Sequence, residues 1–127
     1  MKMFGIGIDV VEVERIASSM DEFGDRFASR IFTDSERAYC AAQRRPEIHY
    51  AARFAAKEAI AKAFGTGIGK ELGWLDMEII RKESGEPALV LTGAGKAFAE
   101  ANRISEVKIS LTHAHHYAAA NAVALAE

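Results

Sequence analysis

Hydrophobic and polar positions alternate over residues 1–13, which is the pattern of a β-strand. One face of this strand carries the larger apolar side chains: Phe4, Ile6, Ile8 and Val10. The other face carries Gly5, Gly7 and Asp9. Aspartate and glycine are both depleted in strands, and glycine allows another group to approach the backbone closely. Asp9 is therefore either an edge-strand acid that faces water or caps the next element, or a residue with a chemical role.

Helical periodicity follows in three short segments. Apolar residues at helical spacing predict a helix over 12–20, and after a break at 21–25 a helical turn is expected at 26–31. Thr33 with Glu36 three residues later is typical of a capping box, so a third helix should begin there and run to about residue 42.

The longest helical segment begins at Glu47 and ends before Gly65, and it is dominated by alanine, glutamate and lysine. Four-residue spacing places Phe54, Glu58 and Lys62 along one side of this helix. A carboxylate can hold a hard metal ion, and a lysine can hold phosphate. The same spacing is also that of an ordinary solvated Glu–Lys pair, so spacing alone does not decide between the two interpretations.

A glycine-rich segment at 65–69 follows the long helix. Such a segment either turns backbone N–H groups toward an anion or simply caps the helix and continues as a loop. It lacks the lysine and serine pattern of a P-loop.

The second half of the chain contains the remaining elements: strands over 74–82, 88–91, 107–111 and 117–125, and a helix over 93–102. Turns at 84–87 and 112–116 join two of these strand pairs into hairpins. We therefore predict one α+β domain, residues 1–127, in which a mostly antiparallel sheet packs against the long helix. The alanine-rich last two strands are a candidate surface for another subunit.

Composition limits the function classes. The chain has 127 residues, half of them hydrophobic, and a net charge of −2, which suits a single modest core and does not favour nucleic acid as a partner. The first half nevertheless contains seven arginines, so a basic face for an acidic partner is expected there. The single cysteine, Cys40, indicates a reducing compartment. No apolar run long enough to span a membrane and no leader segment is found, so we expect a cytoplasmic protein.

Two motifs about fifty residues apart resemble those of the holo-[acyl-carrier-protein] synthases, the short stand-alone branch of the 4′-phosphopantetheinyl transferases. They are the segments GIGIDVVEV at 5–13 and FAAKEAIAKAFGTG at 54–67. The likeness extends to the turn at 85–87 and to the segments at 110–113 and 116–118, so it covers essentially the whole chain.

This resemblance implies a magnesium-dependent transferase of fatty acid biosynthesis. Coenzyme A would donate its 4′-phosphopantetheine arm to a serine of apo acyl-carrier protein, and adenosine 3′,5′-bisphosphate would leave. The resemblance also implies a homotrimer with active sites at the subunit boundaries.

The resemblance assigns roles to particular residues. Asp9 and Glu58 would hold Mg²⁺, and Lys62 would meet the phosphates and stabilise the leaving group. Glu58 and a metal-bound water are both candidates for the base that accepts the serine proton.

The resemblance also implies which residues bind coenzyme A and the carrier. Coenzyme A would be bound by Arg53, Phe54, Lys62, Gly65, Thr66 and His113, with Gly85 and Pro87 of a neighbouring subunit at the adenine. The acidic carrier protein would meet Arg15, Arg26 and Arg30. For Arg53 and for the three carrier-facing arginines, the alternative is an ordinary solvated helix charge.

Three histidines, His113, His115 and His116, fall in one tight turn, but such close spacing rarely gives the tetrahedral geometry of a zinc site. Two other function classes remain as alternatives: a non-enzymatic α+β module that binds a nucleotide or a protein, and a different metal-dependent phosphotransferase.

Overall fold

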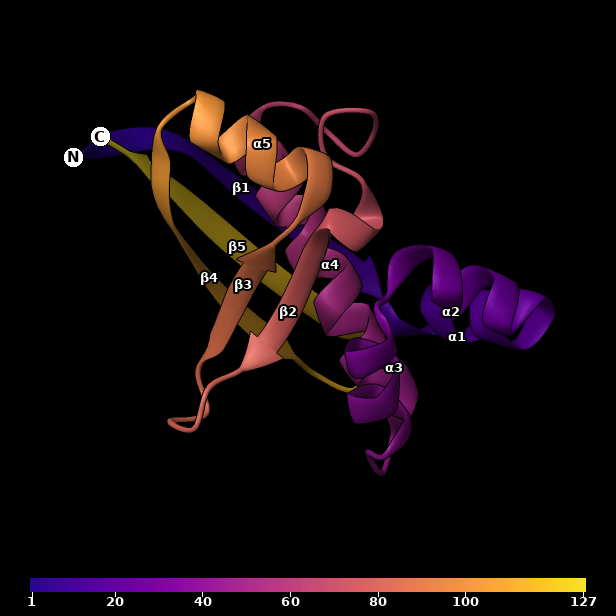
Figure 1. The fold of residues 1–127 in the computed structure, drawn as a ribbon. Helices are drawn as coiled ribbons and strands as arrows, with labels where there is room; N and C mark the ends of the chain where they lie inside the picture. Colours follow the sequence, from indigo (N-terminus) through magenta and orange to yellow (C-terminus); the bar gives the residue numbers. More distant parts are fainter.

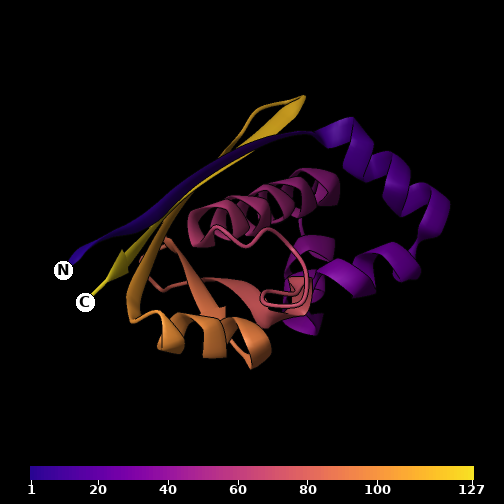
Figure 2. The ribbon, with the colours of Figure 1, turned by 90° about the horizontal axis from the view of Figure 1, so that it is seen from above.

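The long helix α4 (Pro46–Phe64) is the centre of the fold in the computed structural model, which describes residues 1–127. It lies under a three-stranded antiparallel sheet of order β1–β5–β4, and the hairpin β2–β3 and helix α5 lie on its other side (Figure 2). Helices α1 to α3 gather at one end (Figure 1). The bounds of the other elements are β1 Lys2–Glu12, α1 Val13–Phe23, α2 Asp25–Ile31, α3 Asp34–Ala41, η1 Trp74–Asp76, β2 Met77–Arg81, β3 Pro87–Leu91, α5 Gly93–Ala101, β4 Ile104–His113 and β5 Tyr117–Ala126. The predicted α+β domain is therefore confirmed.

Strand β1 touches α4 at backbone distance, and two glycines make this possible. A Cβ atom at Gly7 would lie 2.0 Å from the carbonyl oxygen of Ala59, and one at Gly5 would lie 1.9 Å from that of Ala63. Any other residue at these positions would push the strand and the helix apart. The glycines thus bring Asp9, on the same face of β1, against the side of α4.

A β-bulge near the start of β1 changes the predicted alternation. The register between β1 and β5 shifts between Met3 and Gly5, so Phe4 has no partner on β5. Phe4 instead packs edge-on against Phe98 of α5, with ring centroids 6.3 Å apart. The prediction that Phe4 shares a face with Ile6 is therefore wrong. The apolar outer face of β1 consists of Met3, Ile6, Ile8 and Val10, each exposed by 59–64%.

Two hydrophobic cores meet on α4. One lies between α4, the three-stranded sheet and β2, where the alanines of α4 face the alanines of β5. The other joins α4 to α1, α2 and α3 around Phe32, Cys40 and Tyr50. Small side chains along both α4 and β5 let the helix and sheet pack closely, and this fixes the position of every side chain that α4 presents.

The strand predicted over 107–111 is longer, Ile104–His113. Two other predicted boundaries are wrong for a local reason. Residues Trp74–Asp76 form a 3₁₀ turn rather than the start of a strand, because the Asp76 carboxylate accepts hydrogen bonds from the N–H groups of Gly73 (2.8 Å) and Gly95 (3.1 Å). Helix α1 continues to Phe23 because Gly24, with φ of 54°, is its only stop signal. No helix of the chain combines the length and apolarity that crossing a membrane would need.

Candidate active site

Asp9 and Glu58 line one cavity of about 360 Å³ between β1, α1 and α4. Asp9 reaches it from β1 and Glu58 from α4, so two acids that are remote in sequence share one space. Burial raises the pKa of Glu58, and the nearby Asp9 carboxylate raises it further, while the Lys62 ammonium partly opposes this rise. Since both carboxylates line the same cavity, their like charges repel each other.

Lys62 lies one turn beyond Glu58 on α4 and lines a separate cavity of about 410 Å³ with Ile6, Gly7, Ile8 and Asn121. Its ammonium donates hydrogen bonds to the carbonyl oxygen of Ile8 (2.8 Å) and to Oδ1 of Asp9 (3.2 Å). The Lys62 side chain is 51% exposed, whereas that of Asp9 is 18% exposed. The ammonium is therefore held near the carboxylates but remains accessible to a ligand.

The donor set of this cavity suits a hard cation. Its acidic donors are the carboxylate oxygens of Asp9 and Glu58, and no group of three His, Cys, Asp or Glu side chains that could hold a metal ion occurs in the structure. Magnesium is commonly held by one or two carboxylates, with the remaining positions filled by water and substrate phosphate. Asp9 and Glu58 fit that requirement. The remaining coordination positions would have to be filled by a ligand and by solvent.

The three arginines predicted to meet a carrier protein fall into two groups. Arg15 lines the cavity of Asp9 and Glu58, together with Ser19, Phe27 and Phe54. Arg26 and Arg30 line a neighbouring cavity of about 370 Å³ with apolar walls that include Phe27 and Trp74. Phe27 borders both cavities. We call the second one the arginine-flanked cavity.

Aromatic stacking joins the two cavities. The rings of Phe54 and Trp74 stack with centroids 5.1 Å apart and planes inclined by 30°. Phe54 lines the cavity of the two carboxylates, and Trp74 lines the arginine-flanked cavity. A molecule bound in either one would therefore contact the same aromatic pair.

Arg53 and His113 are not brought to Asp9 and Glu58 within one chain. At about 100° per residue, Arg53 lies roughly 140° around α4 from Glu58. Neither Arg53 nor His113 lines the carboxylate cavity. Arg53 is buried, 5% exposed, so the alternative interpretation of a solvated helix charge is wrong.

Arg53 belongs instead to a basic cluster on the opposite side of α4. Its guanidinium lies 4.3 Å from the ring centroid of Tyr39, and its Nε has no hydrogen-bond partner. Arg81 lies 5.9 Å from the same ring, and the His49 and His113 rings meet edge-on at 5.6 Å. Burial lowers the pKa of His49, and the neighbouring cationic groups lower it further. The cluster concentrates positive charge on this side of α4, and Arg and His side chains of this kind can donate to an anion.

The glycine-rich loop caps α4. Gly65 adopts the left-handed conformation with φ of 80°, and its N–H donates to the carbonyls of Ala61 and Lys62. The N–H of Gly67 also donates to Ala61. The N–H groups of Gly65 and Gly67 are therefore used in capping the helix. Thr66 lines a separate cavity of about 850 Å³ against α5.

The turn that contains Gly85 and Pro87 joins β2 to β3. Gly85 has φ of 93°, which allows the tight turn between the two strands. Neither residue lines the cavity of Asp9 and Glu58, so the structure of one chain does not bring this turn to the carboxylates.

Sequence reasoning missed several residues of these sites. Tyr39, His49 and Arg81 complete the basic cluster, while Phe27 and Trp74 shape the two cavities. The spacing of His49 and Arg53, four residues apart on the long helix, was the one available signal for the cluster. Lys57, next to Glu58, was also missed, and it is buried.

Comparison with known proteins gives a consistent result. The sequence model of the 4′-phosphopantetheinyl transferase superfamily matches residues 5–122. The holo-[acyl-carrier-protein] synthase of Chlamydia trachomatis is 46% identical over 96% of this chain and 99% of its own. The crystal structure of the Neisseria meningitidis synthase superimposes with a TM-score of 0.91 at 35% identity, covering 97% of this chain and 98% of that one. The Helicobacter pylori synthase in complex with coenzyme A gives a TM-score of 0.85 at 32% identity, covering 94% and 99%.

Proposed function

Because the chain belongs to the 4′-phosphopantetheinyl transferase superfamily, and within it to the holo-[acyl-carrier-protein] synthases, we propose the full reaction that it carries out. Coenzyme A donates 4′-phosphopantetheine to a serine of apo acyl-carrier protein, adenosine 3′,5′-bisphosphate leaves, and the reaction depends on Mg²⁺. The observation that carries this proposal is the shared cavity of Asp9 and Glu58, with the Lys62 ammonium hydrogen-bonded to Asp9.

Asp9 and Glu58 are the residues that would hold Mg²⁺. A bound ion would neutralise charge on the pyrophosphate oxygens and so favour attack at the phosphorus. The rigid contact of β1 with α4 through Gly5 and Gly7 fixes the spacing of the two carboxylates before any ligand arrives.

Lys62 supplies the mobile positive charge. Its half-exposed ammonium can turn from Asp9 to a phosphate oxygen and stabilise the negative charge of the leaving bisphosphate. Of the chain's own groups, Glu58 is the candidate acceptor for the serine proton, because its carboxylate lines the cavity that it shares with Asp9.

A homotrimer would complete the site. The basic cluster of Arg53 and His113 lies on the opposite side of α4 from Glu58, so one donor molecule can meet both only if a second copy supplies one of them. The exposed apolar face of β1 continues onto β5, where Met3 pairs with Leu125 and Ile6 with Val123, and this surface suits such contact. Gly65 and Thr66 of one copy, and Gly85 and Pro87 of its neighbour, would then border the donor.

The arginine-flanked cavity is the proposed docking place of the acidic carrier. We predict that Arg26→Glu raises the KM for the carrier at least tenfold at low salt and changes the KM for coenzyme A less than twofold. Steady-state kinetics at two salt concentrations measure both constants. Arg44→Glu, an exposed arginine that lines neither cavity, is the matched control. Equal changes in both KM values would remove the docking assignment.

Mass spectrometry tests the reaction itself. Apo carrier protein is mixed with coenzyme A, Mg²⁺ and this protein. We expect a gain of one phosphopantetheine per carrier, a nucleotide product that co-elutes with adenosine 3′,5′-bisphosphate, and loss of both with EDTA. Glu58→Gln should abolish most of the gain, because an amide is a poorer ligand for Mg²⁺ at nearly the same size. No mass gain with the unmodified protein would reject the proposed function.

A further inference from the structure

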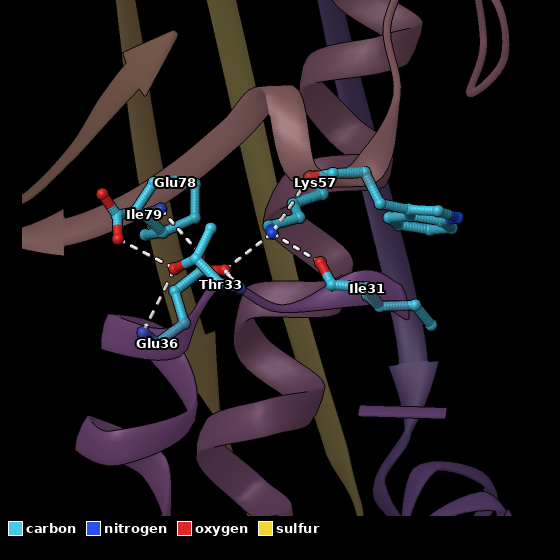
Figure 3. Close-up of polar contacts among 7 residues, drawn as sticks. Ile31, Thr33, Glu36, Lys57, Glu78 and Ile79 are labelled. Carbon is cyan, nitrogen blue, oxygen red and sulfur yellow. Dashed lines mark hydrogen bonds and ion pairs between the residues drawn. The ribbon is translucent and has the colours of Figure 1, made fainter. Parts of the chain in front are cut away.

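A fully buried ion pair lies on α4 beside the proposed site. The Lys57 ammonium is 2.7 Å from Oε1 of Glu36, and both side chains are 0% exposed (Figure 3). The ammonium also donates to the carbonyl oxygens of Ile31 (2.7 Å) and Trp74 (3.2 Å), so all three of its N–H groups are used.

The carboxylate of Glu36 is equally well satisfied. Its Oε1 accepts a second hydrogen bond from the N–H of Thr33 (2.9 Å), and its Oε2 accepts one from the N–H of Ile79 (2.7 Å). The Thr33 hydroxyl in turn donates to Glu78 (2.8 Å). One ion pair therefore joins the end of α2, the start of α3, the middle of α4, the turn η1 and strand β2 (Figure 3).

Both residues whose carbonyl oxygens accept from the Lys57 ammonium line the arginine-flanked cavity. Ile31 is the last residue of α2, the helix that carries Arg26 and Arg30, and both Ile31 and Trp74 line this cavity. A cation at the end of a helix satisfies a carbonyl that has no partner within the helix. The same lysine is adjacent in sequence to Glu58, so α2 and η1 are fixed relative to the carboxylate cavity through one residue.

We propose that the Glu36–Lys57 pair is a positioning element for carrier recognition: it sets the width of the arginine-flanked cavity and its orientation toward Glu58. This inference rests on the proposed function, because it takes the carrier as the occupant of that cavity. An apolar side chain could fill the space of Lys57, but it could not bind two carbonyls from different elements at once. Lys57 contacts neither donor nor carrier and acts through Ile31 and Trp74.

The test replaces both charges together. Glu36→Gln with Lys57→Met keeps nearly the same volume and leaves no lone buried charge. We expect the KM for the carrier to rise at least tenfold, the KM for coenzyme A to change less than twofold, and kcat at saturating carrier to stay within threefold. The matched control, Asp34→Asn with Arg37→Met, removes an ion pair from the same helix α3 in which the Asp34 side chain is 97% exposed and that of Arg37 is 31% exposed, and it should change none of these.

Trp74 gives a second measurement that needs no activity, because it is the only tryptophan of the chain. In the double variant, we expect a red-shifted emission and stronger quenching by acrylamide as η1 loses its attachment to α4. If the unmodified protein transfers nothing while the emission still shifts, the proposed function fails and the link between the ion pair and Trp74 stands.

Three results would overturn the inference: unchanged Trp74 emission and quenching in the folded double variant, equal rises in both KM values, or a fall in kcat with no change in the KM for the carrier. Should the double variant not fold, Glu36→Asp keeps the charge but shortens the side chain. It should then raise the KM for the carrier and the quenching of Trp74 in the same direction by a smaller factor. No change in either quantity would count against the positioning role.

Discussion

Helix α4 carries two lysines, five residues apart, and each pairs with a carboxylate from another element. Lys57 meets Glu36 at 2.7 Å with both side chains fully buried, whereas Lys62 meets Asp9 at 3.2 Å with its own side chain half-exposed. The Lys57 ammonium uses all three N–H groups on the protein, and the Lys62 ammonium uses two. Burial lowers the pKa of Lys57, and Glu36 opposes that shift. The comparison separates a charge committed to structure from a charge left free for a ligand.

The buried Lys57–Glu36 pair should contribute more to the free energy of unfolding than the Lys62–Asp9 pair. Lys57→Met leaves Glu36 as an unpaired buried charge and Ile31 without its donor, so the free energy of unfolding should fall by about 3–5 kcal/mol. Urea denaturation followed by circular dichroism measures this loss, and an unchanged m-value would show that the unfolded state is not altered. A loss below about 1 kcal/mol is what an ordinary surface lysine would give, and it would contradict the structural role of the Lys57–Glu36 pair.

The half-exposed Lys62–Asp9 pair should contribute more to kcat than to stability. Lys62→Met should change the free energy of unfolding by less than about 1 kcal/mol, because exposed ion pairs contribute little. It should lower kcat about a hundredfold, since it removes the charge that stabilises the leaving group. Stopped assays at saturating substrates measure kcat, and Lys96→Met, an exposed lysine on α5, is the control. Nearly full kcat in the Lys62 variant would show that the Lys62–Asp9 pair has no role in transfer.

Several features of the fold and of the candidate site could be predicted from the sequence. Alternation predicted β1, the spacing of Thr33 and Glu36 predicted the capping box that α3 has, and composition with Gly65 predicted the extent of α4. The meeting of Asp9 and Glu58 followed from the family resemblance, and their cavity agrees with it. These features depend on residues that are near one another in sequence or lie in recognisable motifs.

The features that were missed depend on partners that are far apart in sequence. Lys57 is buried because Glu36, Ile31 and Trp74 converge on it, and no local pattern distinguishes it from a solvated lysine. The bulge at Phe4 depends on the register with β5. The split of Arg15 from Arg26 and Arg30 depends on how α1 and α2 pack around Phe27.

Substitution of Gly7 tests whether the close contact between β1 and α4 holds Asp9 in position. Gly7→Ala places a Cβ 2.0 Å from the Ala59 carbonyl, so β1 must move away from α4 and carry Asp9 with it. We expect a loss of about 1–3 kcal/mol in the free energy of unfolding and a higher Mg²⁺ concentration for half-maximal activity. Gly69→Ala is the control, because nothing lies within 4 Å of a Cβ at that position. A shift in stability without a shift in the Mg²⁺ requirement would show that Asp9 does not depend on this contact.

The buried Cys40 thiol of α3 can be used to follow the stability of the region around it. Burial raises the pKa of its thiol from 9.0 to about 11, so between these values the folded protein holds a proton that the unfolded chain has lost. Stability should therefore fall as the pH rises from about 9 to about 11, and Cys40→Ala should remove that part of the decline.

At pH 8, a thiol reagent should label Cys40 slowly in the native protein and faster in the Lys57→Met variant, because a weaker buried pair lets α3 open more often. Lys62→Met should label at the native rate. Equal acceleration in both lysine variants would mean that the two pairs support the same part of the fold.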